Sequence, residues 1–146
     1  MLIDDHLLRD LLAGQAPDEL QIDTTGTPAT TGLWLFRLCA SIARPEVTGR
    51  LSAPLAALGP EAELAFRRAL IRATSRLEIV PLQDLAWSMA ELQVEHAREG
   101  RRLSTLSCEA LAAAHRLQTG IAVSHRDVGP SLEAAARADG VAFQVI

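Results

Sequence analysis

Four acidic side chains occupy positions in the sequence from which they could meet at one edge of a predicted sheet. Asp4 and Asp5 follow a short apolar start, Glu109 lies near the start of a predicted helix, and Asp127 lies just past a predicted strand. In open α/β sheets, the groups that do chemistry lie beyond the carboxyl ends of the strands. Clustered carboxylates repel one another unless a cation is present. The set therefore predicts a site for Mg²⁺ or Mn²⁺, held by oxygen ligands and retained waters.

A metal ion held by carboxylates can activate water and neutralise charge on a phosphodiester that is being cut. Ser124 could support a ligand water or a phosphate at this edge. Each acid also has a local explanation. Asp4 or Asp5 is expected to cap the helix that follows, and Glu109 suits the positive end of a helix dipole. Spacing alone does not decide between metal binding and these local roles.

The stretch Leu103–Asp127 positions two of the acids. Ser107 is expected to cap a helix with Glu109 in its first turn, and Gly120 is expected to end that helix. The wholly apolar run Ile121–Val123 is typical of a parallel strand that is covered on both faces. Asp127 then lies in the loop beyond this strand.

The other elements alternate between helical and strand patterns. We expect a strand at 1–3, a helix at 5–14, a loop at 15–32 with one strand at 20–22, and helices at 33–43, 60–76, 82–99 and 130–140, with strands at 77–80 and 141–146. Such alternation predicts an α/β fold, with three α/β/α layers and a mostly parallel central sheet.

Composition predicts one domain over residues 1–146. Half of the chain is apolar, and the formal net charge of −4 argues against binding nucleic acid by bulk electrostatics. Cys39 and Cys108 lack metal-binding or redox spacing, so we expect reduced core thiols. The chain shows no leader and no long apolar run, which predicts a cytoplasmic protein without a membrane span.

Common catalytic motifs are absent. The sequence contains no dinucleotide fingerprint, no phosphate-binding P-loop and no nucleophile elbow. Its histidines, His6, His96, His115 and His125, do not fall into a zinc spacing, and we expect His96 and His115 at the surface or its boundary. The arginine stripe of the helix at 60–76, which ends at Arg76, could contact phosphates, but a solvated charged face is the commoner reason for such a stripe.

Two parts of the chain carry a family resemblance. Leu2-Ile3-Asp4, followed by a leucine-rich helix that ends at Gly14, resembles the opening of PIN-domain proteins. The segment 77–146 is similar to the second half of that family. The stretches that carry this similarity are Leu-Glu-Ile-Val-Pro-Leu at 77–82, Ser-Cys-Glu-Ala-Leu-Ala-Ala-Ala at 107–114, Ile-Ala-Val-Ser-His-Arg-Asp at 121–127 and Gly-Val-Ala-Phe-Gln-Val-Ile at 140–146.

The resemblance implies a metal-dependent endoribonuclease, most often the toxin of a toxin–antitoxin pair and frequently a homodimer. It implies that Asp4 is the first metal ligand, that Glu109 stands in place of an Asp, and that Ser124 matches a small hydroxylic residue after the strand. The acid normally found two residues later is displaced, because Arg126 stands there and Asp127 follows.

The family's Glu on an early helix has no clear counterpart, because the helix at 33–43 is apolar and cationic and Glu46 lies beyond its end. Arg126 could partly replace the charge of a metal, or it could occupy the metal's place. Asp5, Ser124 and Arg126 are therefore expected as supporting residues around Asp4, Glu109 and Asp127.

Two functions follow from these residues. In the first, Asp4, Glu109 and Asp127 hold Mg²⁺ or Mn²⁺ and the chain cleaves RNA, with an antitoxin as its partner. In the second, the fold is catalytically silent and binds a partner, or a second copy, through apolar surface around Trp34 and Phe36. A small-ligand site at the same sheet edge is a third possibility, with no motif behind it.

Overall fold

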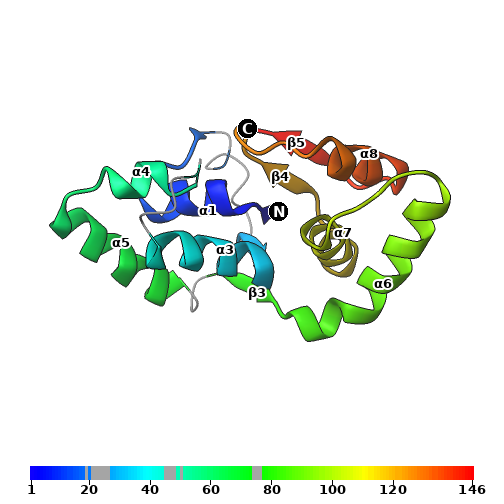
Figure 1. Cartoon of the computed structure of the whole chain (residues 1–146), viewed down its shortest axis with the longest axis horizontal. Coiled ribbons are helices and arrows are strands. Elements are labelled where there is room, and N and C mark those ends of the chain that lie inside the picture. Colours follow the sequence, from blue (N-terminus) through cyan, green and yellow to red (C-terminus); the bar gives the residue numbers. More distant parts are fainter. Residues whose placement is uncertain (19, 21–26, 45–48, 50, 74–76) are drawn as a thin grey trace.

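The central feature of the fold is a five-stranded, all-parallel sheet (Figure 1). This computed structural model describes residues 1–18, 20, 27–44, 49, 51–73 and 77–146. The strands lie in the order β3-β2-β1-β4-β5, with bounds β1 Leu2–Ile3, β2 Ala29–Thr31, β3 Glu78–Val80, β4 Ile121–Val123 and β5 Phe143–Val145. The predicted α/β class and parallel sheet are confirmed.

Helices cover both faces of this sheet. In Figure 1, α1, α3, α4 and α5 lie to one side, and α6, α7 and α8 lie to the other. Their bounds are α1 Asp5–Leu12, α3 Gly32–Ala43, α4 Ala53–Ala56, α5 Pro60–Ala73, α6 Leu82–Arg98, α7 Thr105–Leu117 and α8 Pro130–Ala138. In the described residues, no helix combines the length and the apolar composition needed to cross a membrane.

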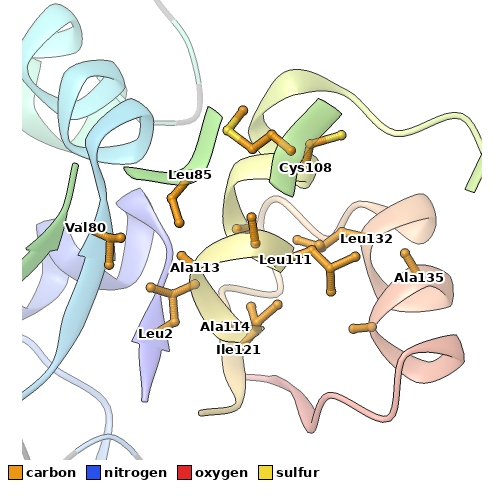
Figure 2. Packing of buried hydrophobic residues seen from close by; sticks show 14 of the residues in the cluster. Leu2, Val80, Leu85, Cys108, Leu111, Ala113, Ala114, Ile121, Leu132 and Ala135 are labelled. Atoms are coloured by element: carbon orange, nitrogen blue, oxygen red, sulfur yellow. The ribbon is translucent and has the colours of Figure 1, made fainter. Parts of the chain in front are cut away.

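Side chains of successive strand residues enter two separate cores, as the pleat of a strand requires. Leu2 belongs to the core that contains α7 and α8, whereas its neighbour Ile3 belongs to the core that contains α1. In β4, Ile121 faces the first core and Ala122 the second. Figure 2 shows the first core, where Leu111 of α7 lies between the sheet and Leu132 of α8. Both faces of β4 are therefore covered, as its apolar run predicted.

Strand β2 corrects the expectation of a loop at this place. The strand pairs with β1 and β3, and the buried Thr30 hydroxyl donates a hydrogen bond to the Ile3 carbonyl oxygen at 3.0 Å. Polar threonines suggested a loop, but a β-branched side chain fits a strand when its hydroxyl finds a partner. The other strand predicted here, at 20–22, falls largely outside the described residues. The predicted end of the arginine stripe, Arg76, also lies outside them.

The limits of α7 also differ from the sequence prediction. Ser104 is the N-cap and its side chain accepts the Ser107 N–H, so Glu109 lies beyond the first turn. The helix ends at Gln118, which takes the left-handed conformation with φ 50°. Gly120 has another role, because a Cβ there would lie 3.1 Å from both Cβ and the carbonyl oxygen of Ala142. Glycine therefore lets β4 and β5 approach closely.

Two expectations about single residues were wrong. Cys108 is buried as predicted, but Cys39 is exposed. His96 is buried, and its Nε2 lies 3.3 Å from Asp139 Oδ2, which also lies 3.0 Å from His115 Nε2. Burial of His96 is possible because its ring nitrogens have partners at the junction of three helices.

Candidate acidic site at the sheet edge

Asp4 joins the ends of two neighbouring strands. It follows β1 directly and caps α1, because one carboxylate oxygen accepts the Leu7 N–H at 2.8 Å. The other accepts the N–H of Ser124, which follows β4, also at 2.8 Å. Burial raises the pKa of Asp4 to about 6, although these two hydrogen bonds favour the charged form. Asp4 is thus both the expected cap and a carboxylate at the sheet edge.

Asp5 is fully buried and is held very differently. Neither of its carboxylate oxygens has a hydrogen-bond partner. Arg37 Nε lies 3.0 Å from Asp5 Oδ2, so the pair is held by charge rather than by an aligned hydrogen bond. Burial raises the pKa of Asp5 to about 7, and the nearby Arg37 charge opposes this rise.

Arg37 occupies the centre of the site. It extends from α3, and its Nη2 lies 3.0 Å from Asp127 Oδ2 while its Nε faces Asp5. The family resemblance implies a Glu on an early helix, and the sequence offers no clear counterpart for it on this one. The side chain of α3 that reaches the acids is instead a cation. The sequence signal was present, since Arg37 is the only charged residue of α3, which is otherwise almost entirely apolar.

Asp127 is the most accessible of the four acids. It lies in the loop after β4, its side chain is 46% exposed, and its N–H donates to the Ser124 carbonyl oxygen. Ser124 supports this loop further, because its Oγ accepts the Arg126 N–H. The Arg126 guanidinium lies 3.3 Å from Oδ2 of Asp10, a residue near the end of α1. The cation that pairs with Asp127 is Arg37, whereas Arg126 pairs with Asp10.

Glu109 extends from α7 to the first turn of α3. Its two carboxylate oxygens are 3.2 and 3.1 Å from the Leu33 nitrogen, which donates its N–H to them. The residue is fully buried, and burial raises its pKa, while hydrogen bonds from Thr31 and Leu33 oppose the rise. In this position Glu109 satisfies a backbone N–H that the first turn of a helix leaves free.

Two cavities share Arg37 and Asp127 as walls. One, of about 200 Å³, is also lined by Asp4 and Trp34. The other, of about 480 Å³, is also lined by His6. Asp127 therefore borders both cavities, and Asp4 borders the smaller one.

The fit of this site to a metal ion depends on its donor atoms. Among the described residues, Asp5, His6 and Asp127 form the group whose potential ligand atoms all lie within 4.8 Å of one another. Asp4, Glu109 and Asp127 do not form such a group there. Buried carboxylate oxygens without hydrogen bonds, as in Asp5, are suited to a cation. The residues present therefore fit a divalent ion, and their nearest cation here is Arg37.

Comparisons with known proteins place the fold. No protein-family model and no curated protein matches the chain. The crystal structure of FitAcB from Neisseria gonorrhoeae is similar, with a TM-score of 0.62 and 17% identity over 98% of this chain and 95% of that chain. The structure of FitAB bound to the IR36 DNA fragment gives a TM-score of 0.61 and 17% identity, over 99% and 93%. The chain has a PIN-like fold.

On this PIN-like fold, the sequence prediction located part of the edge. Asp4, Ser124 and Asp127 meet at the carboxyl ends of β1 and β4, as the parallel sheet predicted. Asp5 lies with them. His6 and Arg37 were not predicted, because their approach to Asp127 depends on how α1 and α3 pack. That Glu109 ligates a metal stays a prediction.

Proposed function

We propose that this PIN-like chain is a metal-dependent endoribonuclease that hydrolyses RNA phosphodiesters as the toxin of a toxin–antitoxin pair. The observation that carries the proposal is the buried carboxylate of Asp5, without hydrogen bonds, beside Asp4 and Asp127 at the sheet edge. FitAB supports the second half of the proposal, since FitB is a PIN-domain toxin of such a pair. An antitoxin protein, a homodimeric state and a cytoplasmic location belong to the same proposal.

Each residue has a defined task in this function. The N–H groups of Leu7 and Ser124 fix the orientation of the Asp4 carboxylate. Asp127 is exposed enough to meet both an ion and a phosphate. A bound Mg²⁺ or Mn²⁺ would supply an activated water and neutralise charge on the phosphodiester. Arg37 holds Asp5 and Asp127 together when no other cation does so, and its guanidinium is suited to contact a phosphate.

The silent-module alternative has less support. It assigned partner binding to apolar surface around Trp34 and Phe36. Trp34 is only 4% exposed and belongs to the core, which leaves Phe36, 65% exposed, as the apolar side chain of that surface.

Cleavage of a labelled oligoribonucleotide tests the proposal. The purified full-length chain is expected to cut the RNA with Mn²⁺ or Mg²⁺, and EDTA is expected to stop the reaction. Asp4→Asn should abolish cleavage, because it removes a charge at the sheet edge. Asp18→Asn alters an exposed aspartate outside the cluster and should keep full activity. Cleavage that survives both EDTA and Asp4→Asn, or no cleavage with either ion, would overturn the proposal.

Glu109→Gln tests the predicted third ligand. The Gln side chain keeps a carbonyl oxygen for the Leu33 N–H but lacks the negative charge. If Glu109 is a ligand, the variant should keep its melting temperature within a few degrees and lose about tenfold or more in Mn²⁺ affinity by calorimetry. Unchanged affinity would limit Glu109 to holding the start of α3.

A further inference from the structure

The cavity on the α1 side of Arg37 contains a second kind of metal donor. His6 follows Asp5 in the first turn of α1, and it is only 1% exposed. One of its ring nitrogens lies within 4.8 Å of a carboxylate oxygen of Asp5 and of one of Asp127. The two acids and the imidazole come from opposite ends of the sequence, and packing brings them together.

The packing of the protein does not account for the His6 side chain. Its Nδ1 is buried and has no hydrogen-bond partner. Buried histidines normally satisfy their ring nitrogens, as His96 does in this fold with Arg101 and Asp139. The Arg37 ion pairs balance the charges of Asp5 and Asp127, but they offer nothing to His6.

This combination of donors differs from an all-oxygen magnesium site. Imidazole nitrogen suits first-row transition metals such as Fe²⁺, Ni²⁺, Cu²⁺ and Zn²⁺, whereas Mg²⁺ prefers oxygen ligands. We propose that Asp5, His6 and Asp127 form a transition-metal site, with His6 as its nitrogen ligand. The inference deepens the proposed function by naming the class of metal at the edge where Asp127 lies, and binding can be measured without RNA.

Arg37 sets the affinity of this site. Its guanidinium lies between Asp5 and Asp127, so a metal ion has to displace it. The side chain is 35% exposed and borders cavities on two sides, which gives it room to move. In metal-free protein Arg37 then bridges Asp5 and Asp127, and in metal-loaded protein the ion bridges them.

Pulsed electron paramagnetic resonance of Mn²⁺ added to the full-length protein tests the nitrogen ligand directly. The wild-type complex should show modulation from a directly bound ¹⁴N nucleus. His6→Gln should remove that signal and weaken Mn²⁺ binding by at least about tenfold. His125→Gln is the matched control, because His125 is exposed and lies outside the group, and it should change neither result. No nitrogen signal in the wild-type protein would overturn the proposal.

Arg37→Gln provides a second test that does not depend on removing a ligand. Loss of the competing cation should tighten Mn²⁺ binding about tenfold or more, and circular dichroism should show a folded protein. Weaker or unchanged binding by a folded Arg37→Gln variant would contradict the competition. Affinity for Mg²⁺ should change less in His6→Gln than affinity for Mn²⁺, since the imidazole contributes little to a magnesium site.

The metal site and the nuclease activity can fail separately. Mn²⁺ bound with a nitrogen signal but without RNA cleavage would leave this site intact and overturn the proposed function. RNA cleavage with Mg²⁺, together with no nitrogen signal from Mn²⁺, would support the proposed function and overturn the transition-metal site.

Discussion

Asp4 and Asp5 are adjacent, but their surroundings stabilise the charged form to different degrees. Two backbone N–H groups donate to Asp4, whereas none donates to Asp5. The pKa of Asp4 is accordingly raised to about 6 and that of Asp5 to about 7. Asp5 therefore depends on Arg37 for its ionised form near neutral pH.

The raised pKa values of Asp4 and Asp5 predict how stability varies with pH. Between about pH 4 and pH 7 the folded chain binds more protons at Asp4 and Asp5 than the unfolded chain, whereas burial lowers the pKa of His6 to about 4 and offsets part of this difference. The two acids outweigh the one histidine, so the free energy of unfolding should fall as pH rises. The total change should be on the order of a few kcal/mol, and it should level off above the pKa of Asp5. Urea denaturation in EDTA at pH 4, 5, 6, 7 and 8 measures this dependence.

Asp5→Asn should remove much of that slope, because an amide does not titrate. Asp18→Asn should keep it. Equal slopes in the wild-type and Asp5→Asn proteins would show that Asp5 titrates with an ordinary pKa in the folded chain.

At the scale of single elements, sequence predicted strand β4 and most helices, because apolar periodicity dominates there. It missed β2, whose Thr30 is buried only because the Ile3 carbonyl oxygen lies within reach of its hydroxyl. It also misplaced the start of α7, since Ser104 and Ser107 are equally good caps locally. Such choices are decided by partners from distant parts of the chain.

The close contact between β4 and β5 predicts the effect of Gly120→Ala. The new Cβ would lie 3.1 Å from Ala142 Cβ and from the Ala142 carbonyl oxygen, so one strand has to shift. We expect a loss of about 1–3 kcal/mol in the free energy of unfolding, measured by urea denaturation. Gly59→Ala is the matched control, because its Cβ would meet nothing within 4 Å. Similar losses in both variants would contradict the contact.

At the scale of the whole molecule, the sheet separates two cores that the sequence pattern could only partly assign. Apolar spacing identified inner faces of helices. It could not tell which helix covers which face of the sheet, nor that Arg37 of α3 would meet acids from both ends of the chain. Both assignments depend on tertiary packing.

The shared sheet predicts that the two cores unfold together. Leu38 and Leu111 are fully buried in different cores, and replacing either by Ala should cost about 2–5 kcal/mol. Circular dichroism and tryptophan fluorescence, with Trp34 buried in one core, should report one transition in each variant. Val94→Ala, at a half-exposed position, should have little effect. Separate transitions in Leu38→Ala would show that the faces fold independently.

The position of β1 has a consequence for synthesis on the ribosome. This strand is translated well before β4, yet the two are neighbours in the middle of the sheet, where Leu2 pairs with Ile121. A nascent chain lacks one neighbour of β1 until residues 121–123 have emerged, and long-range pairing of this kind forms late. Asp4 and Asp127 therefore cannot meet until both β1 and residues 121–127 have emerged, so the acidic edge assembles only after that point.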